Sequence, residues 1–324
     1  MSTSSEPNSK RGSALLTVLW LTAALSAIGV AVASNVRGET ERTSTAVDDT
    51  KAYFVARGAI ERAALHMQWR YYTDDARHPL YFQPGQPRID LDFPGAQATV
   101  EVIPATSKLN VNGIRPEDLL RLLTALQVPI GDATEITSAI LDWRTVADAA
   151  HPSPFDAFYL SQTPSFLPRH SSYQEDDELL LTKGMTPEIY YGDSLGAAHS
   201  GLRDCLSVYG SNAGIDINTA QPATLLAIGI SPEDVKAIVT RRTAQPWLDF
   251  RDVAQVAEAL GPPGRQLMLG GRSIYTLRAT ARLKRPDGTL SDMRRTVAAL
   301  VQINLPGNTR QMAPGYQVLR WFDR

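Results

Sequence analysis

The sequence is poor in cysteine and has no excess of either charge. Cys205 is the only cysteine among 324 residues, which excludes an intrachain disulfide framework and a zinc site built on thiolates. The chain has 32 basic and 34 acidic residues, so it has no overall field that would attract nucleic acid or acidic lipid. The charge is unevenly distributed, however: residues 142–193 hold nine acidic and three basic side chains, and residues 271–324 hold ten basic and three acidic ones. Residues 142–193 could therefore bind cations, and residues 271–324 could bind acidic partners. The alternative is that both segments are solvated surfaces without a partner.

Motifs for catalysis are also scarce. The five histidines show no metal-ligand spacing, and no glycine-rich phosphate loop is present. The spacing Gly192-x-Ser194-x-Gly196 fits a nucleophile elbow, but an elbow needs a buried strand before it, and residues 187–191 instead resemble the end of a short helix. We therefore expect a protein without enzymatic activity.

The N-terminal region contains one long apolar run. Residues 13–36 form 24 positions without a charge, which is long enough for a helix to cross the hydrocarbon core of a membrane with some tilt. Lys10 and Arg11 come immediately before this run, and the positive-inside tendency places them in the cytoplasm. We expect a single-pass inner-membrane protein whose remaining chain lies outside the cytoplasm, in the periplasm.

Three processing schemes are open for this segment. A signal peptide would be cut after Ala31-Val32-Ala33, yet its apolar part should be only about 7–15 residues long. In the second scheme the sequence Lys10-Arg11-Gly12 resembles the signal for prepilin peptidase, which would cut between Gly12 and Ser13 and leave the whole span on the mature chain. An uncleaved anchor is the third. The length of the run favours cleavage at Gly12–Ser13.

The helical pattern continues beyond the membrane. Apolar residues recur at steps of three and four between Tyr53 and Met67. One continuous helix of about 55–60 residues would place its first half in lipid and its second half on a soluble domain. This is the body plan of a type IV pilin-like subunit, and two separate helices are the alternative.

The soluble region contains a duplicated segment. The pattern Leu109-Asn110-Val111-Asn112 with Pro116, Leu119 and Leu120 recurs 106 residues later as Ile215-Asp216-Ile217-Asn218 with Pro222, Leu225 and Leu226. The pattern of each copy predicts a short extended segment, a turn and a helix that begins with proline. Further helices are expected at residues 136–143 and 232–242, so the two copies would form a compact helical module.

Within the second copy, residues 225–241 also resemble a helix-hairpin-helix motif, which often binds the DNA backbone. A membrane-anchored DNA-binding or uptake protein is therefore a rival interpretation. Glu233 and Asp234 lie where phosphates would approach, and Asp132 and Glu135 occupy the equivalent stretch of the first copy. These carboxylates favour a hairpin used for packing, so we expect no nucleic-acid partner.

The C-terminal region predicts a β-hairpin. Residues 274–283 and 290–303 flank the turn Pro286-Asp287-Gly288, and residues 98–103 can add a third strand. The expected fold class is α+β: a pilin-like long N-terminal helix with a small antiparallel sheet, carrying a large inserted α-helical domain. The expected segments are a leader (1–12), a transmembrane helix (13–36), the rest of the helix with the first strands (37–107), the inserted domain (108–264) and the C-terminal hairpin (265–324).

Several motifs together resemble the minor pseudopilin K family of type II secretion systems. They are the paired asparagine motifs, Leu141-Asp142-Trp143-Arg144, and residues 177–185 (DELLLTKGM), which we expect to be a helix with a glycine stop. The resemblance covers nearly the whole chain through the order and spacing of these motifs. It implies a non-enzymatic subunit of a periplasmic pseudopilus that serves the export of folded proteins. A minor pilin of a type IV pilus shares the anchor and is a second alternative.

In pilin-like families the fifth residue of the mature chain is usually glutamate. Counting from Ser13, this position is Thr17, and the K-type minor pseudopilins depart from the pattern in the same way. The resemblance therefore implies a place at the pseudopilus tip. It also implies other minor pseudopilins as partners, prepilin peptidase as the processing enzyme with methylation of the new N-terminus, and contact with secreted cargo or the outer-membrane secretin.

The resemblance also implies calcium in the acidic loop after the tryptophan. The family pattern has an aspartate directly after Trp-Arg, whereas this chain reads Trp143-Arg144-Thr145. Asp148, Asp156 and Asp177 match the remaining acidic positions and are the candidate ligands. Calcium needs six to eight oxygen ligands, so a solvated acidic loop is an equal alternative.

Overall fold

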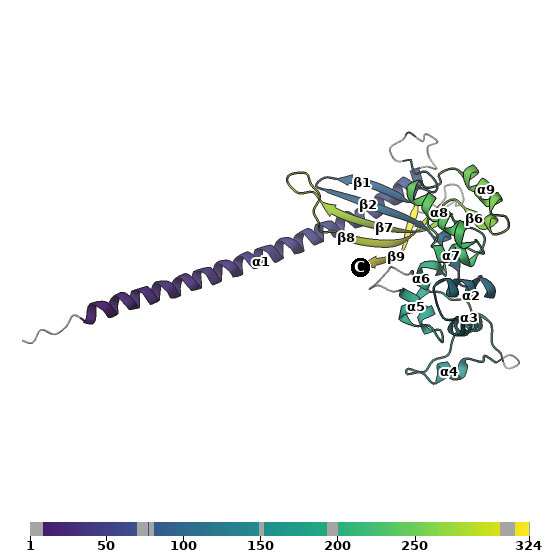
Figure 1. Ribbon diagram of the computed structural model, residues 1–324, viewed down its shortest axis with the longest axis horizontal. Coiled ribbons are helices and arrows are strands. Elements are labelled where there is room, and N and C mark those ends of the chain that lie inside the picture. Colours follow the sequence, from purple (N-terminus) through teal and green to yellow (C-terminus); the bar gives the residue numbers. More distant parts are fainter. Residues whose placement is uncertain are drawn as a thin grey trace, which may run out of the picture.

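The computed structural model describes residues 9–69, 77, 81–148, 152–192, 200–304 and 315–323. A single long helix, α1, projects from a body that consists of a β-sheet and a helical module (Figure 1). The expected α+β fold with a pilin-like helix, a small antiparallel sheet and helical insertions is confirmed.

Helix α1 spans Ser9–Trp69 and contains 61 residues, so the expected continuous helix is confirmed. Its apolar first half is exposed, and it is the one helix of the described residues that is long and apolar enough to cross a membrane. The segment between Val36 and Ala52 is polar. Its threonines donate hydroxyl hydrogen bonds to carbonyl oxygens four residues earlier, namely at Thr40, Thr43, Thr45 and Thr50.

From Ala52 onward one side of α1 is buried against the sheet. The buried positions recur at helical spacing and most are alanine, which lets the helix approach the sheet closely: Ala52, Ala56, Ala59, Ile60, Ala63, Ala64 and Met67. A core of these residues and the inner face of the sheet therefore joins α1 to the body.

The sheet has five antiparallel strands in the order β1-β2-β7-β8-β9. The strands are β1 (Arg88–Phe93), β2 (Ala96–Pro104), β7 (Ile274–Leu283), β8 (Arg295–Ile303) and β9 (Tyr316–Asp323). Alternate residues of β7 and β8 face α1, as the period of two requires. The hairpin and the third strand were expected from the sequence, whereas the edge strands β1 and β9 were not.

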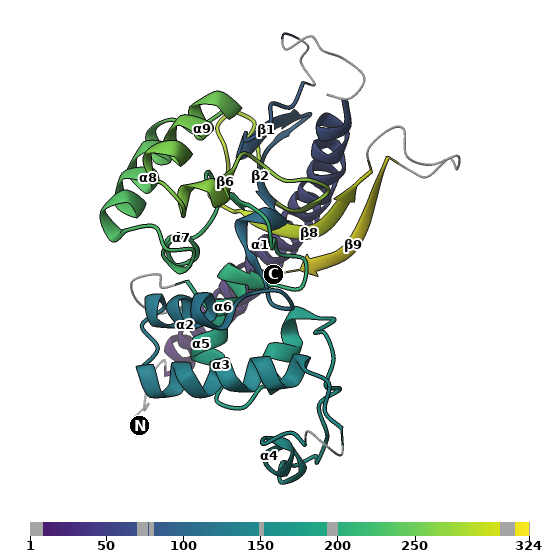
Figure 2. The same cartoon turned by 90° about the vertical axis from the view of Figure 1, so that its right-hand side faces the viewer.

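The helical module lies between β2 and β7 in the chain and has its own apolar core. Its α-helices are α2 (Pro116–Ala125), α3 (Ile130–Arg144), α4 (Asp156–Leu160), α5 (Pro187–Tyr191), α6 (Leu202–Cys205), α7 (Pro222–Ala227), α8 (Pro232–Ala244) and α9 (Phe250–Ala259). Three short 3-10 helices are η1 (Ala105–Ser107), η2 (Asp176–Leu181) and η3 (Gly264–Gln266). In Figure 2 the module forms two groups beside the sheet, one with α7, α8 and α9 and one with α2, α3, α5 and α6.

One expected helix differs from the structure. Residues 177–185 do not form an α-helix: they contain most of η2, which ends at Leu181, and a turn follows in which Gly184 has φ 81°. Three consecutive acidic residues open this segment, and the side chain of Asp176 binds a backbone N–H outside it. This contact with a distant segment holds the start of η2 in place, and the left-handed Gly184 ends the segment in a turn.

The duplicated segments form matching structures. The extended piece of the first copy, β3 (Leu109–Asn110), pairs in parallel with β4 (Leu206–Ser207). That of the second copy, β5 (Ile215–Asp216), pairs in parallel with β6 (Leu267–Met268). Each is followed by a proline-started helix, α2 or α7. The two helices pack together, and the guanidinium of Arg121 on α2 donates to the carbonyl of Ala227 on α7.

Each copy is also held by an asparagine at the same position. Asn112 donates to the carbonyl of Tyr173 and accepts from its N–H. Asn218 does the same with Trp247 and in addition donates to the carbonyl of Gly85, a residue before β1. The second asparagine therefore connects the helical module to the sheet body.

Two arginines close the turns of the repeat. Arg144 at the end of α3 donates to the carbonyls of Val111 and Ile114 at 2.6 Å each. Arg242 on α8 donates to two carbonyls in the second copy at 3.0 and 2.7 Å. The acceptors of Arg242 are Ile217 and Ala220, which are the repeat equivalents of the acceptors of Arg144. The duplication thus extends to tertiary hydrogen bonds.

Candidate functional site

The predicted processing position lies within α1. The helix begins at Ser9, so the Gly12–Ser13 peptide bond is inside its first turns. Thr17 is exposed, and its hydroxyl donates to the carbonyl of Ala14 at 2.8 Å. The hydroxyl at the usual glutamate position is therefore hydrogen-bonded within its own helix. Thr17 presents no carboxylate to a neighbouring subunit.

The three candidate calcium ligands make separate contacts. Asp156 lies 2.9 Å from His170 Nε2, and Asp177 accepts from the hydroxyl of Tyr190 and from Arg320. Asp148 is exposed. No group of three or more histidine, cysteine, aspartate or glutamate side chains within the described ranges could hold a metal ion. The structure does not assemble the expected three-aspartate set, and calcium binding through it stays a prediction.

The hairpin of the second helix-hairpin-helix-like unit uses its own polar groups. Gly229 has φ 94° in the turn, a conformation that favours glycine. Ser231 caps α8 by accepting from the N–H of Asp234 and donates to the carboxylate of the same residue. A phosphate would meet this carboxylate and that of Glu233 in the first turn of α8, which opposes DNA binding. In the elbow-like sequence, Ser194 lies outside the described residues.

An apolar row runs along the outer side of α1 above the membrane segment. Val47, Phe54 and Leu65 are 47%, 61% and 53% exposed. They are separated by seven and eleven residues, close to two and three helical turns, so they share one face. Large apolar side chains in one exposed row indicate an interaction surface.

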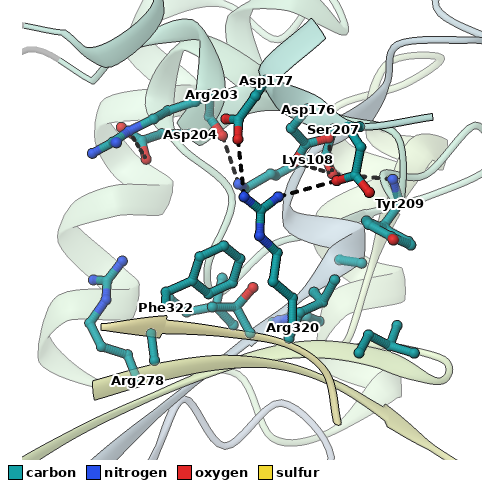
Figure 3. A pocket seen from close by; sticks show the side chains of 18 of the residues that line it. Lys108, Asp176, Asp177, Arg203, Asp204, Ser207, Tyr209, Arg278, Arg320 and Phe322 are labelled. Atoms are coloured by element: carbon teal, nitrogen blue, oxygen red, sulfur yellow. Dashed lines mark hydrogen bonds and ion pairs between the residues drawn. The ribbon is translucent and has the colours of Figure 1, made fainter. Parts of the chain in front are cut away.

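A cleft of about 380 Å³ lies between the sheet and the helical module (Figure 3). Its floor is the sheet face that points away from α1, and its other wall contains η2, α5 and α6. Arg320 on β9 crosses the cleft and contacts Glu175 and Asp177 at 3.1 Å each. Polar and charged side chains from distant parts of the chain therefore meet in this cleft.

Sequence reasoning missed the residues that build this cleft. Lys108, Arg203 and Arg320 come from three separate segments, and no local pattern marked them. The only available signal was the charge distribution, since Arg320 belongs to the basic end and its partners belong to the acidic middle.

These features define a class of protein. An apolar helix that is long enough to span a membrane continues without a break onto one face of a small antiparallel sheet. This arrangement is that of a membrane-anchored, pilin-like subunit, here with a large helical module inserted between two strands of the sheet.

Comparison with known proteins shows a resemblance to one family of pilin-like subunits. Residues 105–192 match a model of the family "Type II secretion system (T2SS), protein K". The type II secretion system protein K of Klebsiella pneumoniae is 26% identical over 280 residues, which cover 79% of this chain and 81% of the relative. The predicted resemblance to the K-type minor pseudopilins of type II secretion is confirmed.

The fold agrees with a solved structure from a type 2 secretion system. A chain in the crystal structure of the GspK–GspI–GspJ complex from the type 2 secretion system of enterotoxigenic Escherichia coli matches with a TM-score of 0.54. The match covers 87% of this chain and 99% of that chain at 17% sequence identity. The two proteins therefore share a fold over most of their length.

Proposed function

We propose that this protein is a non-enzymatic minor pseudopilin that forms or caps the tip of a periplasmic pseudopilus in type II secretion. In this role it is anchored in the inner membrane by α1, with its body in the periplasm. It joins other minor pseudopilins and supports the export of folded proteins across the outer membrane. The observation that carries the proposal is the shared fold with a chain of the GspK–GspI–GspJ complex.

Thr17 supports the position at the tip. A carboxylate at this place in other pilin-like subunits is costly in lipid unless the N-terminal amine of a neighbour meets it. Thr17 has no carboxylate, and its hydroxyl is bonded within its own helix. A subunit without this acceptor suits a place where no neighbour's amine arrives, which is the end of the filament.

The apolar row on α1 supports association through the helix. Each large apolar side chain that a partner buries contributes about 1.5–3 kcal/mol. Phe54 and Leu65 are more than half exposed in the single chain, so a partner helix or body can cover them. The nearby guanidinium of Arg57 lies over the ring of Trp321 on β9 at 4.8 Å, so this side chain already contacts the body of its own subunit.

Co-purification from membranes tests this function. The full chain should retain other minor pseudopilins after mild detergent extraction, and its mature N-terminus should be Ser13. Phe54→Ser with Leu65→Ser should lower the retained partners at least tenfold. The control is Glu41→Ser, an exposed change on the side of α1 roughly opposite Phe54 and Leu65, which should leave the partners bound.

Other outcomes would point to different functions. Pilus subunits in place of secretion pseudopilins would identify a type IV minor pilin, and co-purified DNA would identify an uptake protein. A mature N-terminus at Ser34 would show that the span is removed, and it would end the pseudopilin interpretation.

A further inference from the structure

The cleft between sheet and module has the size and walls of a binding site. Its volume of about 380 Å³ lies within the range of about 300–1,000 Å³ typical of ligand pockets. Thr276 and Arg278 of β7 lie on its floor, while the intervening Leu277 is fully buried against α1. The floor is thus the sheet face that α1 leaves free, and the helical module covers it only in part.

The carboxylates on the walls already have protein donors. Arg320 pairs with Glu175 and Asp177. Asp176 accepts from a serine hydroxyl at 3.0 Å and from a backbone N–H at 2.7 Å. Asp204 accepts from the N–H three residues before it. Each of these acidic side chains therefore already accepts from at least one donor within the protein.

The cations on the walls, in contrast, have donors to spare. The ammonium of Lys108 can donate three hydrogen bonds and makes one, to the carbonyl of Arg203 at 2.6 Å. The guanidinium of Arg203 stacks on the ring of Tyr191 at 4.9 Å. Its nearest carboxylate, Asp204, is 4.0 Å away, and it donates no side-chain hydrogen bond within the described part of the chain. Arg278 makes one such bond, to Glu101.

The electrostatics agree with this balance of donors and acceptors. Burial lowers the pKa of Lys108, and the carboxylates of Asp176 and Asp204 oppose this shift only in part. An additional negative group in the cleft would favour the charged ammonium.

The shape of the site favours a polypeptide over a small ion. Strand β9 is at the edge of the sheet and has a neighbour on one side only among the described strands. Its residues Leu319, Arg320 and Phe322 line the cleft. An extended segment can therefore place its main chain along β9 and its side chains in the cleft, as in recognition by strand addition.

We propose that this cleft binds an acidic, extended segment of a partner protein, whose carboxylates pair with Lys108 and Arg203. This role goes beyond the proposed place in the pseudopilus and does not depend on it. The basic C-terminal region, with its ten basic and three acidic residues from position 271, brings such a segment toward the cleft.

Peptide binding to the full chain in detergent micelles tests the proposal. The probe is a fluorescent, end-blocked octapeptide in which glutamate alternates with serine, and its counterpart carries glutamine in place of glutamate. Fluorescence anisotropy should show binding of the glutamate peptide and at least tenfold weaker binding of the glutamine peptide. Arg203→Gln should weaken the binding of the glutamate peptide about tenfold.

Two controls separate this site from general attraction. Arg88→Gln removes an exposed arginine on β1 outside the cleft and should leave the affinity unchanged. Arg203→Lys retains the charge and should restore part of the affinity. Circular dichroism identifies any variant that fails to fold. If a variant fails, the comparison of the glutamate and glutamine peptides on the unaltered chain still decides the proposal.

Three results would overturn the proposal. They are equal affinity for the two peptides, an equal loss with Arg88→Gln, and no binding at millimolar peptide. Displacement of the peptide by an equal concentration of free glutamate would show that the cleft takes a small carboxylate and that the strand contact contributes nothing.

Discussion

Replacing Asn218 by alanine should be among the most destabilising single changes in the body of the protein. The side chain is 8% exposed and makes three hydrogen bonds, at 2.9, 2.7 and 2.9 Å, to Gly85 and Trp247. Its loss leaves two carbonyls and one N–H without a partner in a buried place. Each such group costs about 1–3 kcal/mol, and water can regain part of this, so we expect a loss of about 3–5 kcal/mol.

The repeat supplies an internal comparison for this value. Asn112 is only partly buried and makes two of the three equivalent bonds, both to Tyr173. Asn112→Ala should therefore cost about 1–3 kcal/mol. The matched control is Asn212→Ala, since Asn212 is exposed, and a surface change of this kind stays within about 0.5 kcal/mol.

Urea unfolding of the full chain in detergent, followed by tryptophan fluorescence, measures the three losses. Trp247 is bonded directly to Asn218, so its emission reports the relevant part of the body. The order should be Asn218, then Asn112, then Asn212. The reasoning would be refuted if Asn218→Ala cost no more than the exposed control, because the buried bonds would then contribute no net stability.

Three further outcomes concern the anchor, the acidic loop and the body of α1. Thr17→Glu should lower secretion and leave the amount of inserted protein unchanged, because one central carboxylate costs about 2.5–3.5 kcal/mol against some twenty apolar positions; normal secretion at equal protein level would contradict this. Asp177 is already paired with Arg320, so millimolar calcium or EDTA should leave the thermal unfolding midpoint unchanged. A calcium-dependent rise that Asp177→Asn abolishes would instead establish the predicted site. Burial, and to a lesser extent Arg62, lowers the pKa of His66 from 6.5, so the folded state favours the neutral ring and stability is lost as the pH falls from 6.5 through the folded pKa. Urea midpoints at pH 7.5 and pH 5 should therefore differ less for His66→Leu than for the unaltered chain, and an equal difference would exclude His66 as the cause.

The parts of the fold that follow from local pattern were predictable. The uncharged run at residues 13–36 and the helical spacing from Tyr53 to Met67 gave the anchor and its continuation. The equal spacing of the two asparagine motifs gave the repeat. Each of these signals depends on a short stretch of sequence, so a single chain was enough to find them.

Contacts between distant segments were not predictable in the same way. Arg144 follows its first carbonyl partner, Val111, by 33 residues, whereas Arg242 follows Ile217 by 25, so a search for equal spacing could not pair the two arginines. Strand β1 is an edge strand with exposed charges on alternate positions, which weakens its apolar signal.

The candidate site shows the same limit. Asp148, Asp156 and Asp177 were grouped because they lie in one acidic stretch of sequence. In the structure Asp156 contacts His170, while Asp177 contacts a strand that follows it by about 140 residues. Nearness in sequence says little about which carboxylates share a ligand once a loop folds over two different surfaces.

The polar part of α1 sets the height of the body above the membrane. Ala52, the first residue buried against the sheet, follows Val36, the last of the apolar run, by sixteen positions. At 1.5 Å per residue this segment is about 24 Å long. If α1 stands upright in the membrane, the body is therefore raised on a stalk, with a gap beneath it that is wide enough for a neighbouring helix. Threonine hydroxyls bonded to the preceding turn often bend helices, and four of them lie in this stalk. A bend at these threonines would tilt the raised body while α1 stays one continuous helix.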